Sequence, residues 1–145
     1  MTEPTPLACG APFRLPAVTG VSVTGRFPTT VDRSEVVLSG TVSLVSTDSD
    51  RTVVTSPEAD VFLVRDGVVV TEPLVQDSMG SQASLALGEE LSLPATGALV
   101  PCASDDPGGP PLAPGPYELY ARVLLSNDDG TAQECFGGPW LVELR

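Results

Sequence analysis

The segment from Leu112 to Leu125 constrains the fold more than any other part of the chain. It places Leu112, Pro114, Gly115 and Tyr117 in the order LxPGxY. Beyond the tyrosine, apolar residues alternate along the chain: Leu119, Ala121, Val123 and Leu125. This pattern is typical of a tyrosine corner, in which a buried phenol ring opens a strand and its hydroxyl bonds to upstream backbone. We therefore assign these four residues a structural role.

Further strand signals lie on both sides of the corner. Residues 36–44 alternate between apolar and polar side chains, which predicts a half-buried strand. Asp66-Gly67 lies between two apolar runs and predicts a hairpin. Residues 127–130 predict the last hairpin turn, and residues 137–139 a bulge in the final strand.

The length of 145 residues fits one domain, and 15 Pro and 14 Gly without a period favour many short strands. We predict an all-β fold, a single antiparallel immunoglobulin-like β-sandwich of about seven to eight strands. A jelly roll is the alternative. Residues 13–145 form the domain, and residues 1–12 an extended N-terminal lead-in.

Three motifs carry a family resemblance: Asp66-Gly67, the LGEELSL segment at residues 87–93, and the LxPGxY corner. Their order resembles bacterial immunoglobulin-like or fibronectin-III-like domains, among them the BsuPI-type family, named for an intracellular proteinase inhibitor. The resemblance implies the fold. It also implies a protein-binding, inhibitor-like function as one alternative, for which we expect the loop of residues 102–116 to act.

Charge and residue types exclude several function classes. The chain has 19 acidic and 7 basic residues, a net charge of -12, and neither Lys nor His. Nucleic acids and anionic membranes need a basic surface, and histidine catalysis needs a histidine. No apolar run approaches the length of a membrane helix. We expect a protein that is not an enzyme, binds no nucleic acid and does not insert into a membrane.

The three cysteines, Cys9, Cys102 and Cys135, lack metal-ligand spacing. We favour a disulfide between Cys9 and Cys135, because the first strand of an immunoglobulin-like fold commonly lies beside the last. Cys9 with Cys102 is the runner-up, and three reduced thiols remain open. A disulfide points to an oxidising compartment.

Acidic residues gather in two loops that this topology places at one end of the domain. Calcium prefers clustered oxygen donors, so the loops suggest a calcium site, although such residues are also ordinary in turns. No other cofactor is expected. The candidate ligands are Asp48, Asp50, Asn127, Asp128 and Asp129.

Three aromatic side chains, Tyr120, Phe136 and Trp140, could form an exposed patch on the sheet. The leading function is a noncatalytic, secreted or cell-surface module for adhesion, scaffolding or ligand presentation. Its partner is another protein or a cell-surface polymer. The first residues do not resemble an export signal, so we expect either that the signal has been removed or that the protein is cytoplasmic. The alternatives are a cytoplasmic location and a carboxylate-based glycan hydrolase.

Overall fold

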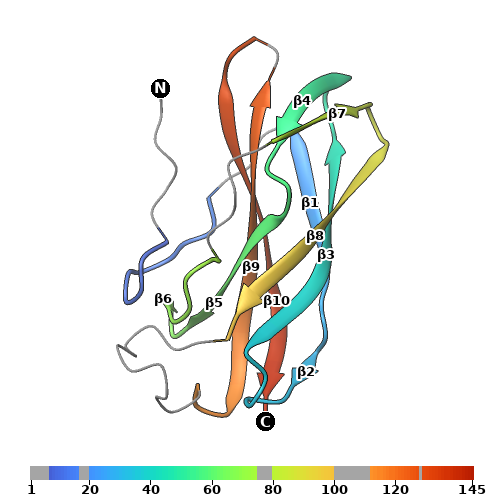
Figure 1. Ribbon diagram of the computed structural model, residues 1–145. Helices are drawn as coiled ribbons and strands as arrows, with labels where there is room; N and C mark the ends of the chain where they lie inside the picture. The colour runs from blue at the N-terminus through green and yellow to red at the C-terminus, as the bar shows by residue number, and fades with distance from the viewer. Residues whose placement is uncertain (1–6, 17–19, 75–79, 100–111, 128) are drawn as a thin grey trace.

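The computed structural model describes residues 7–16, 20–74, 80–99, 112–127 and 129–145. In this part of the chain, ten strands form one continuous sheet that curls like a half-barrel (Figure 1). No described residue is helical, so the all-β prediction is confirmed. The strands are β1 (Val21–Arg26), β2 (Thr30–Val31), β3 (Val37–Ser46), β4 (Arg51–Thr55), β5 (Ala59–Arg65), β6 (Val68–Val69), β7 (Ser81–Leu85), β8 (Glu90–Ala98), β9 (Gly115–Asn127) and β10 (Ala132–Leu144).

The structure does not show the two separate antiparallel sheets of an immunoglobulin-like sandwich. Its strands follow the order β1-β3-β8-β5-β9-β10-β2, with β4 paired to β7 and β9, and β6 paired to β5. β8 and β5 pair in parallel through Ala59 opposite Ala95 and Asp60 opposite Thr96, and this short contact joins the two halves. Since β2 also pairs in parallel with β10, the sheet is mixed. Alternation predicts which side chains face inward, but not which strand edges meet.

The local turn and bulge predictions are confirmed. Asp66 and Gly67 both have positive φ, at 55° and 78°, which suits a two-residue hairpin turn. The long β9–β10 hairpin closes where the Asn127 amide donates to the Thr131 carbonyl oxygen at 2.8 Å. The register of β10 against β9 shifts between Gly137 and Trp140, as a bulge requires.

The main hydrophobic core fills the concave side of the curled sheet. Its side chains come from the inward positions of β1, β3, β4, β5, β7, β8, β9 and β10, and Tyr117 is among them. Trp140 packs at the edge of this core, with its ring 5.3 Å from that of Phe27. A Cβ atom on either Gly25 or Gly137 would come within 2.9 Å of the Trp140 ring, so β1 and β10 approach closely only because both residues are glycines.

A second hydrophobic cluster covers the outer face of β5, β9 and β10. Phe13 lies over it, 4.7 Å from the ring of Tyr120 and 5.8 Å from that of Phe136. Tyr120 is 7% exposed and Phe136 is 5% exposed, so the expected exposed aromatic patch is wrong. The cluster contains Leu7, Phe62, Val64, Val69, Tyr120 and Phe136.

The segment before β1 is what buries this face. Gly10 donates its amide to Val69, Val69 donates to Ala11, and Phe13 donates to Gly67, each at 2.9 Å. The described part of the expected lead-in therefore belongs to the folded unit, because its apolar side chains cover apolar side chains of the sheet.

Candidate functional site

The LxPGxY segment has tyrosine-corner geometry. The Tyr117 ring is 3% exposed, and its hydroxyl donates to the carbonyl oxygen of Ala113 at 2.6 Å. Arg65 donates to the same hydroxyl at 3.1 Å and lies over the ring at 4.8 Å. Gly115 has a φ of 130°, and a Cβ there would meet the Arg65 guanidinium at 2.8 Å. Leu112 is buried and Pro114 is exposed. The sequence did not indicate the role of Arg65.

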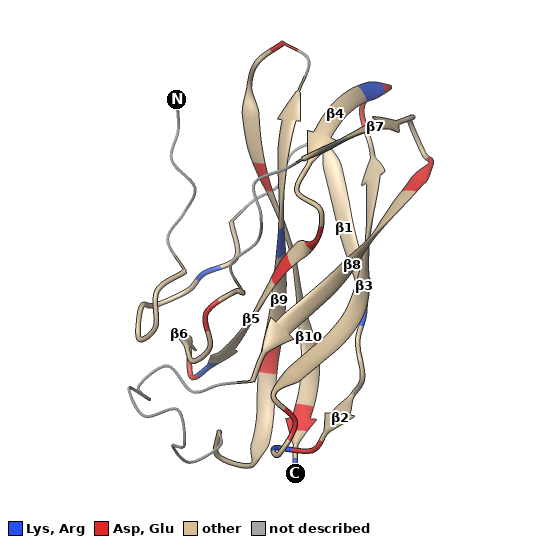
Figure 2. Cartoon of the chain, viewed as in Figure 1, with Lys and Arg blue, Asp and Glu red and all other residues tan. Residues whose placement is uncertain are grey.

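An arginine lies at the acidic loops that suggested calcium, bonded to one of them and to strand β10. Asp48 accepts two hydrogen bonds from the Arg51 guanidinium, at 2.8 Å and 2.9 Å, and Arg51 also donates to Gln133 of β10 at 3.3 Å. Arg51 lowers the pKa of Asp48 and, through its charge, contributes to lowering that of Asp129. Figure 2 shows the blue start of β4 at the same end of the molecule as the β9–β10 turn.

The other candidate calcium ligands bond to nearby groups of the chain. Asp50 accepts from the Leu87 amide at 2.8 Å, and Asn127 donates to the Thr131 hydroxyl at 3.1 Å. Asp129 accepts from the Thr131 amide and hydroxyl, which lowers its pKa. Asp128 lies outside the described residues.

A calcium cluster is not formed among the described acidic residues. No group of three or more acidic or cysteine side chains in that part of the chain could hold a metal ion. The two loops do lie at one end, but the positive charge between them is the Arg51 guanidinium. Sequence reasoning could not place this side chain, because its surroundings depend on how β4 pairs with β7 and β9.

The favoured disulfide between Cys9 and Cys135 is wrong. Cys135 is free and fully buried inside the main core. Burial raises the pKa of its thiol to about 11. Cys9 is disulfide-bonded. The runner-up pairing remains a prediction, because Cys102 lies outside the described residues. The same holds for most of the 102–116 loop, on which the inhibitor alternative depends.

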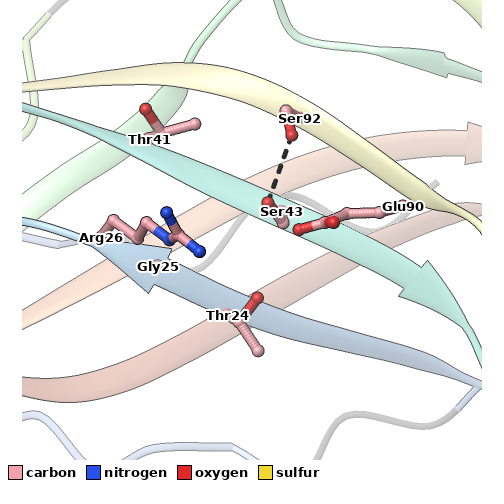
Figure 3. A pocket seen from close by; sticks show the side chains of 7 residues that line it. All are labelled: Thr24, Gly25, Arg26, Thr41, Ser43, Glu90 and Ser92. Carbon is pink, nitrogen blue, oxygen red and sulfur yellow. Dashed lines mark hydrogen bonds between the residues drawn. The ribbon is translucent and has the colours of Figure 1, made fainter.

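A groove not anticipated from the sequence lies on the outer face of β1, β3 and β8. It has a volume of about 550 Å³ and is lined mainly by short polar side chains (Figure 3). Its central residue, Ser43, shares a hydrogen bond with Ser92 at 3.3 Å. The lining residues are Thr24, Gly25, Arg26, Thr41, Ser43, Glu90 and Ser92.

The alternation of the three strands explains the groove. Inward residues such as Val42 and Leu44 are fully buried, so the intervening positions must point outward. Register places Thr24, Ser43 and Ser92 side by side across the sheet. Their short side chains form the floor, and the longer Arg26 and Glu90 side chains bound it (Figure 3).

The groove carries one positive and one negative side chain among neutral hydroxyls. The three ion pairs of the described residues involve neither Arg26 nor Glu90. Glu90 is the one carboxylate in the described lining, so a two-carboxylate hydrolase site is not assembled there. The alternation of residues 36–44 predicts a half-buried strand and no site. The signal that could mark a site is the absence of long side chains at Ser39, Thr41 and Ser43.

No family model matches the chain, and no curated protein matches it. Among solved structures it is similar to the putative ApaA protein from Bordetella pertussis, with a TM-score of 0.49 and 20% identity over 96% of this chain and 98% of that one. It is also similar to the sporulation control protein Spo0M from Bacillus subtilis, with a TM-score of 0.45 and 15% identity over 88% of this chain.

The chain spans half the length of the Spo0M structure. A third similar structure is the alkylpurine DNA glycosylase AlkC from Pseudomonas fluorescens, with a TM-score of 0.41 and 16% identity over 87% of this chain and 30% of that one. At these TM-scores the likenesses carry no argument about function. Within the described residues, no helix is long and apolar enough to cross a membrane.

Proposed function

We propose that this protein is a noncatalytic, secreted or cell-surface β-module that binds its ligand in the groove formed by β1, β3 and β8. The observation that carries the proposal is the contrast between its two outer faces. The N-terminal segment covers the face of β5, β9 and β10. The face of β1, β3 and β8 is open and hollowed, with a volume in the range of small-ligand sites.

The chemistry of the groove supports binding rather than catalysis. A serine nucleophile needs a base that takes its proton. The hydrogen-bond partner of Ser43 is the hydroxyl of Ser92, which is a very weak base. Arg26 supplies charge and hydrogen-bond donors. The lining residues, the Glu90 carboxylate included, can orient a polar ligand by charge and hydrogen bonds.

A disulfide at Cys9 supports an oxidising compartment, as expected for an exported protein. The net charge of -12 supports a protein or a cell-surface polymer as the partner, rather than a nucleic acid. Mass spectrometry of proteolytic fragments without reduction tests the compartment. A Cys9–Cys102 fragment is the expected result, and three unmodified cysteines in the native protein would contradict export.

The binding function is tested by two-dimensional NMR of the amides during titration with a panel of polar peptides and oligosaccharides. We expect at least one compound to shift amide signals of β1, β3 and β8 together, and to be recovered unchanged. Ligand-induced shifts confined to other strands, or conversion of the compound, would contradict the proposal.

A matched pair of variants separates the groove from the rest of the surface. Ser92→Trp places a large ring in the groove, and we expect it to abolish the shifts. Leu141→Trp places the same ring at a position of β10 that is 72% exposed and outside the groove lining. This control should bind as the unmodified protein does.

A further inference from the structure

The two charged side chains of the groove lie on opposite strands and in different rows of the sheet. Arg26 on β1 shares a row with Thr41 of β3, and Glu90 on β8 shares a row with Val45 of β3. Between these rows lies the hydroxyl row that contains Ser43. The groove therefore has a positive corner, a neutral polar centre and a negative corner.

Strand geometry gives the scale of this arrangement. Four residues along a strand and two strand spacings across the sheet put the Cα atoms of Arg26 and Glu90 roughly 17 Å apart. Both side chains lean toward Ser43 (Figure 3), so their charged groups are nearer to each other than the Cα atoms. A ligand complementary to both corners must carry a negative and a positive group, separated by a polar linker.

The centre of the groove also selects for polarity. Ser43 is 9% exposed, and its hydroxyl is in contact with that of Ser92. An apolar ligand would cover these hydroxyls without bonding to them, which opposes binding. Peptide groups supply both donors and acceptors to such hydroxyls. The described lining has no aromatic ring on which a sugar could stack.

We infer that the ligand is a short zwitterionic peptide, with a carboxylate at Arg26, an ammonium at Glu90 and peptide groups over Ser43 and Ser92. This inference rests on the proposed binding function and specifies its ligand class. An extended tripeptide is about 10 Å long, so it fits within the roughly 17 Å between the two Cα atoms. Both charged contacts lie at the solvent-exposed rim, so each changes affinity by about 1.5- to fivefold.

The probe is the tripeptide Gly-Ser-Gly in four forms: with free ends, N-acetylated, C-amidated, and blocked at both ends. Amide shifts of β1, β3 and β8 report the binding of each form. We expect the free form to bind most tightly, and each block to weaken binding by about 1.5- to fivefold. A doubly blocked peptide with internal Lys and Asp residues distinguishes side-chain charges from chain ends. Its binding would assign the site to an internal peptide segment of the same chemistry.

Variants then assign each charge to its residue. Arg26→Gln should abolish the advantage of the free carboxylate and keep that of the free amine, and Glu90→Gln should do the reverse. Arg145→Gln and Glu89→Gln remove the same charges outside the groove and should leave both preferences intact. Because each readout compares two peptides on one variant, a general loss of fold would not produce this crossed pattern.

Equal binding of all four peptide forms would overturn the zwitterion assignment. A neutral oligosaccharide that shifts the groove signals when no peptide does would also overturn it, while leaving the proposed binding function intact. If no compound shifts signals in the groove, both the ligand class and the binding function are wrong.

Discussion

Replacing Tyr117 by Phe removes one oxygen atom from the best-defined feature of the fold. The ring is 3% exposed and packs within the main core, so a phenylalanine can occupy the same space. The hydroxyl donates to Ala113 at 2.6 Å and accepts from Arg65 at 3.1 Å. The substitution therefore separates the hydrogen bonds of the corner from its hydrophobic packing.

The expected loss of stability depends on how well water can replace the hydroxyl as the hydrogen-bond partner of Ala113 and Arg65. A neutral hydrogen bond contributes about 1 kcal/mol to stability, and one with a charged donor about 1.5–3 kcal/mol. Ala113 is exposed and Arg65 is partly exposed, so water can replace much of what each loses. We expect Tyr117→Phe to lower the free energy of unfolding by about 1–2 kcal/mol, with a fall in Tm of about 3–8 °C. Tyr117→Ala also removes the ring and should cost about 3–5 kcal/mol.

Urea unfolding followed by the fluorescence of the single tryptophan, Trp140, measures these differences. Tyr120→Phe is the matched control, because its hydroxyl bonds at 2.6 Å to the Glu118 carboxylate two residues away on the same strand. That bond joins no separate segments, so its loss should cost less than the loss at Tyr117. If Tyr117→Phe unfolds with the same midpoint and slope as the unmodified protein, the hydrogen bonds do not stabilise the corner. An equal cost at both tyrosines would refute the argument that the corner bond is special.

Three further predictions test other parts of the structure. Phe13→Ala should lower the free energy of unfolding by about 2–4 kcal/mol in the same assay, because Phe13 covers three aromatic rings; an unchanged midpoint would show that the N-terminal segment is not part of the stable fold. Cys135 should resist thiol reagents until the protein unfolds, and rapid labelling of the folded protein at pH 8 would contradict its burial. Its pKa is raised from 9.0 to about 11, so the stability that comes from burying the neutral thiol is present below pH 9 and decreases as pH rises toward 11. The pKa of Asp48 is lowered, so its contribution to stability is present above its ordinary pKa and is lost as pH falls through the lowered pKa. Arg51→Gln should raise the Asp48 pKa measured by NMR. An unchanged pKa would show that the Asp48–Arg51 ion pair is absent in solution.

Features that depend on a few neighbouring residues could be predicted from the sequence. The Asp66-Gly67 turn needs positive φ at two adjacent residues, and that pair permits it. The bulge near Gly137 likewise follows from residues that fit poorly into a regular ladder. Backbone conformations of this kind restrict which residue types can occupy a position, so they can be predicted from the sequence. Both predictions are confirmed.

Features that depend on distant partners could not be predicted in the same way. Phe13 has no local pattern that shows it will cover Tyr120, and this contact turned an expected exposed patch into a second core. Arg51 has no local pattern that shows it will lie between two acidic loops and bond to Gln133, which is 82 residues away. In each case the sequence gives the type of side chain, but strand pairing determines which distant residue it contacts.

The groove depends both on neighbouring residues and on distant partners, and this difference bears on the function of the open face of β1, β3 and β8. Its polar floor is local, since alternate residues of each strand must face outward when the others are buried. Its shape is not local, because the hollow exists only where the short side chains of three strands meet in register, with Ser43 at the centre. Long charged side chains across this face would also keep it solvated, because charged residues are mostly exposed in folded proteins. The restriction of charge in the groove lining to Arg26 and Glu90 is therefore not required by solubility in a chain with a net charge of -12, and it is what the proposed binding function requires.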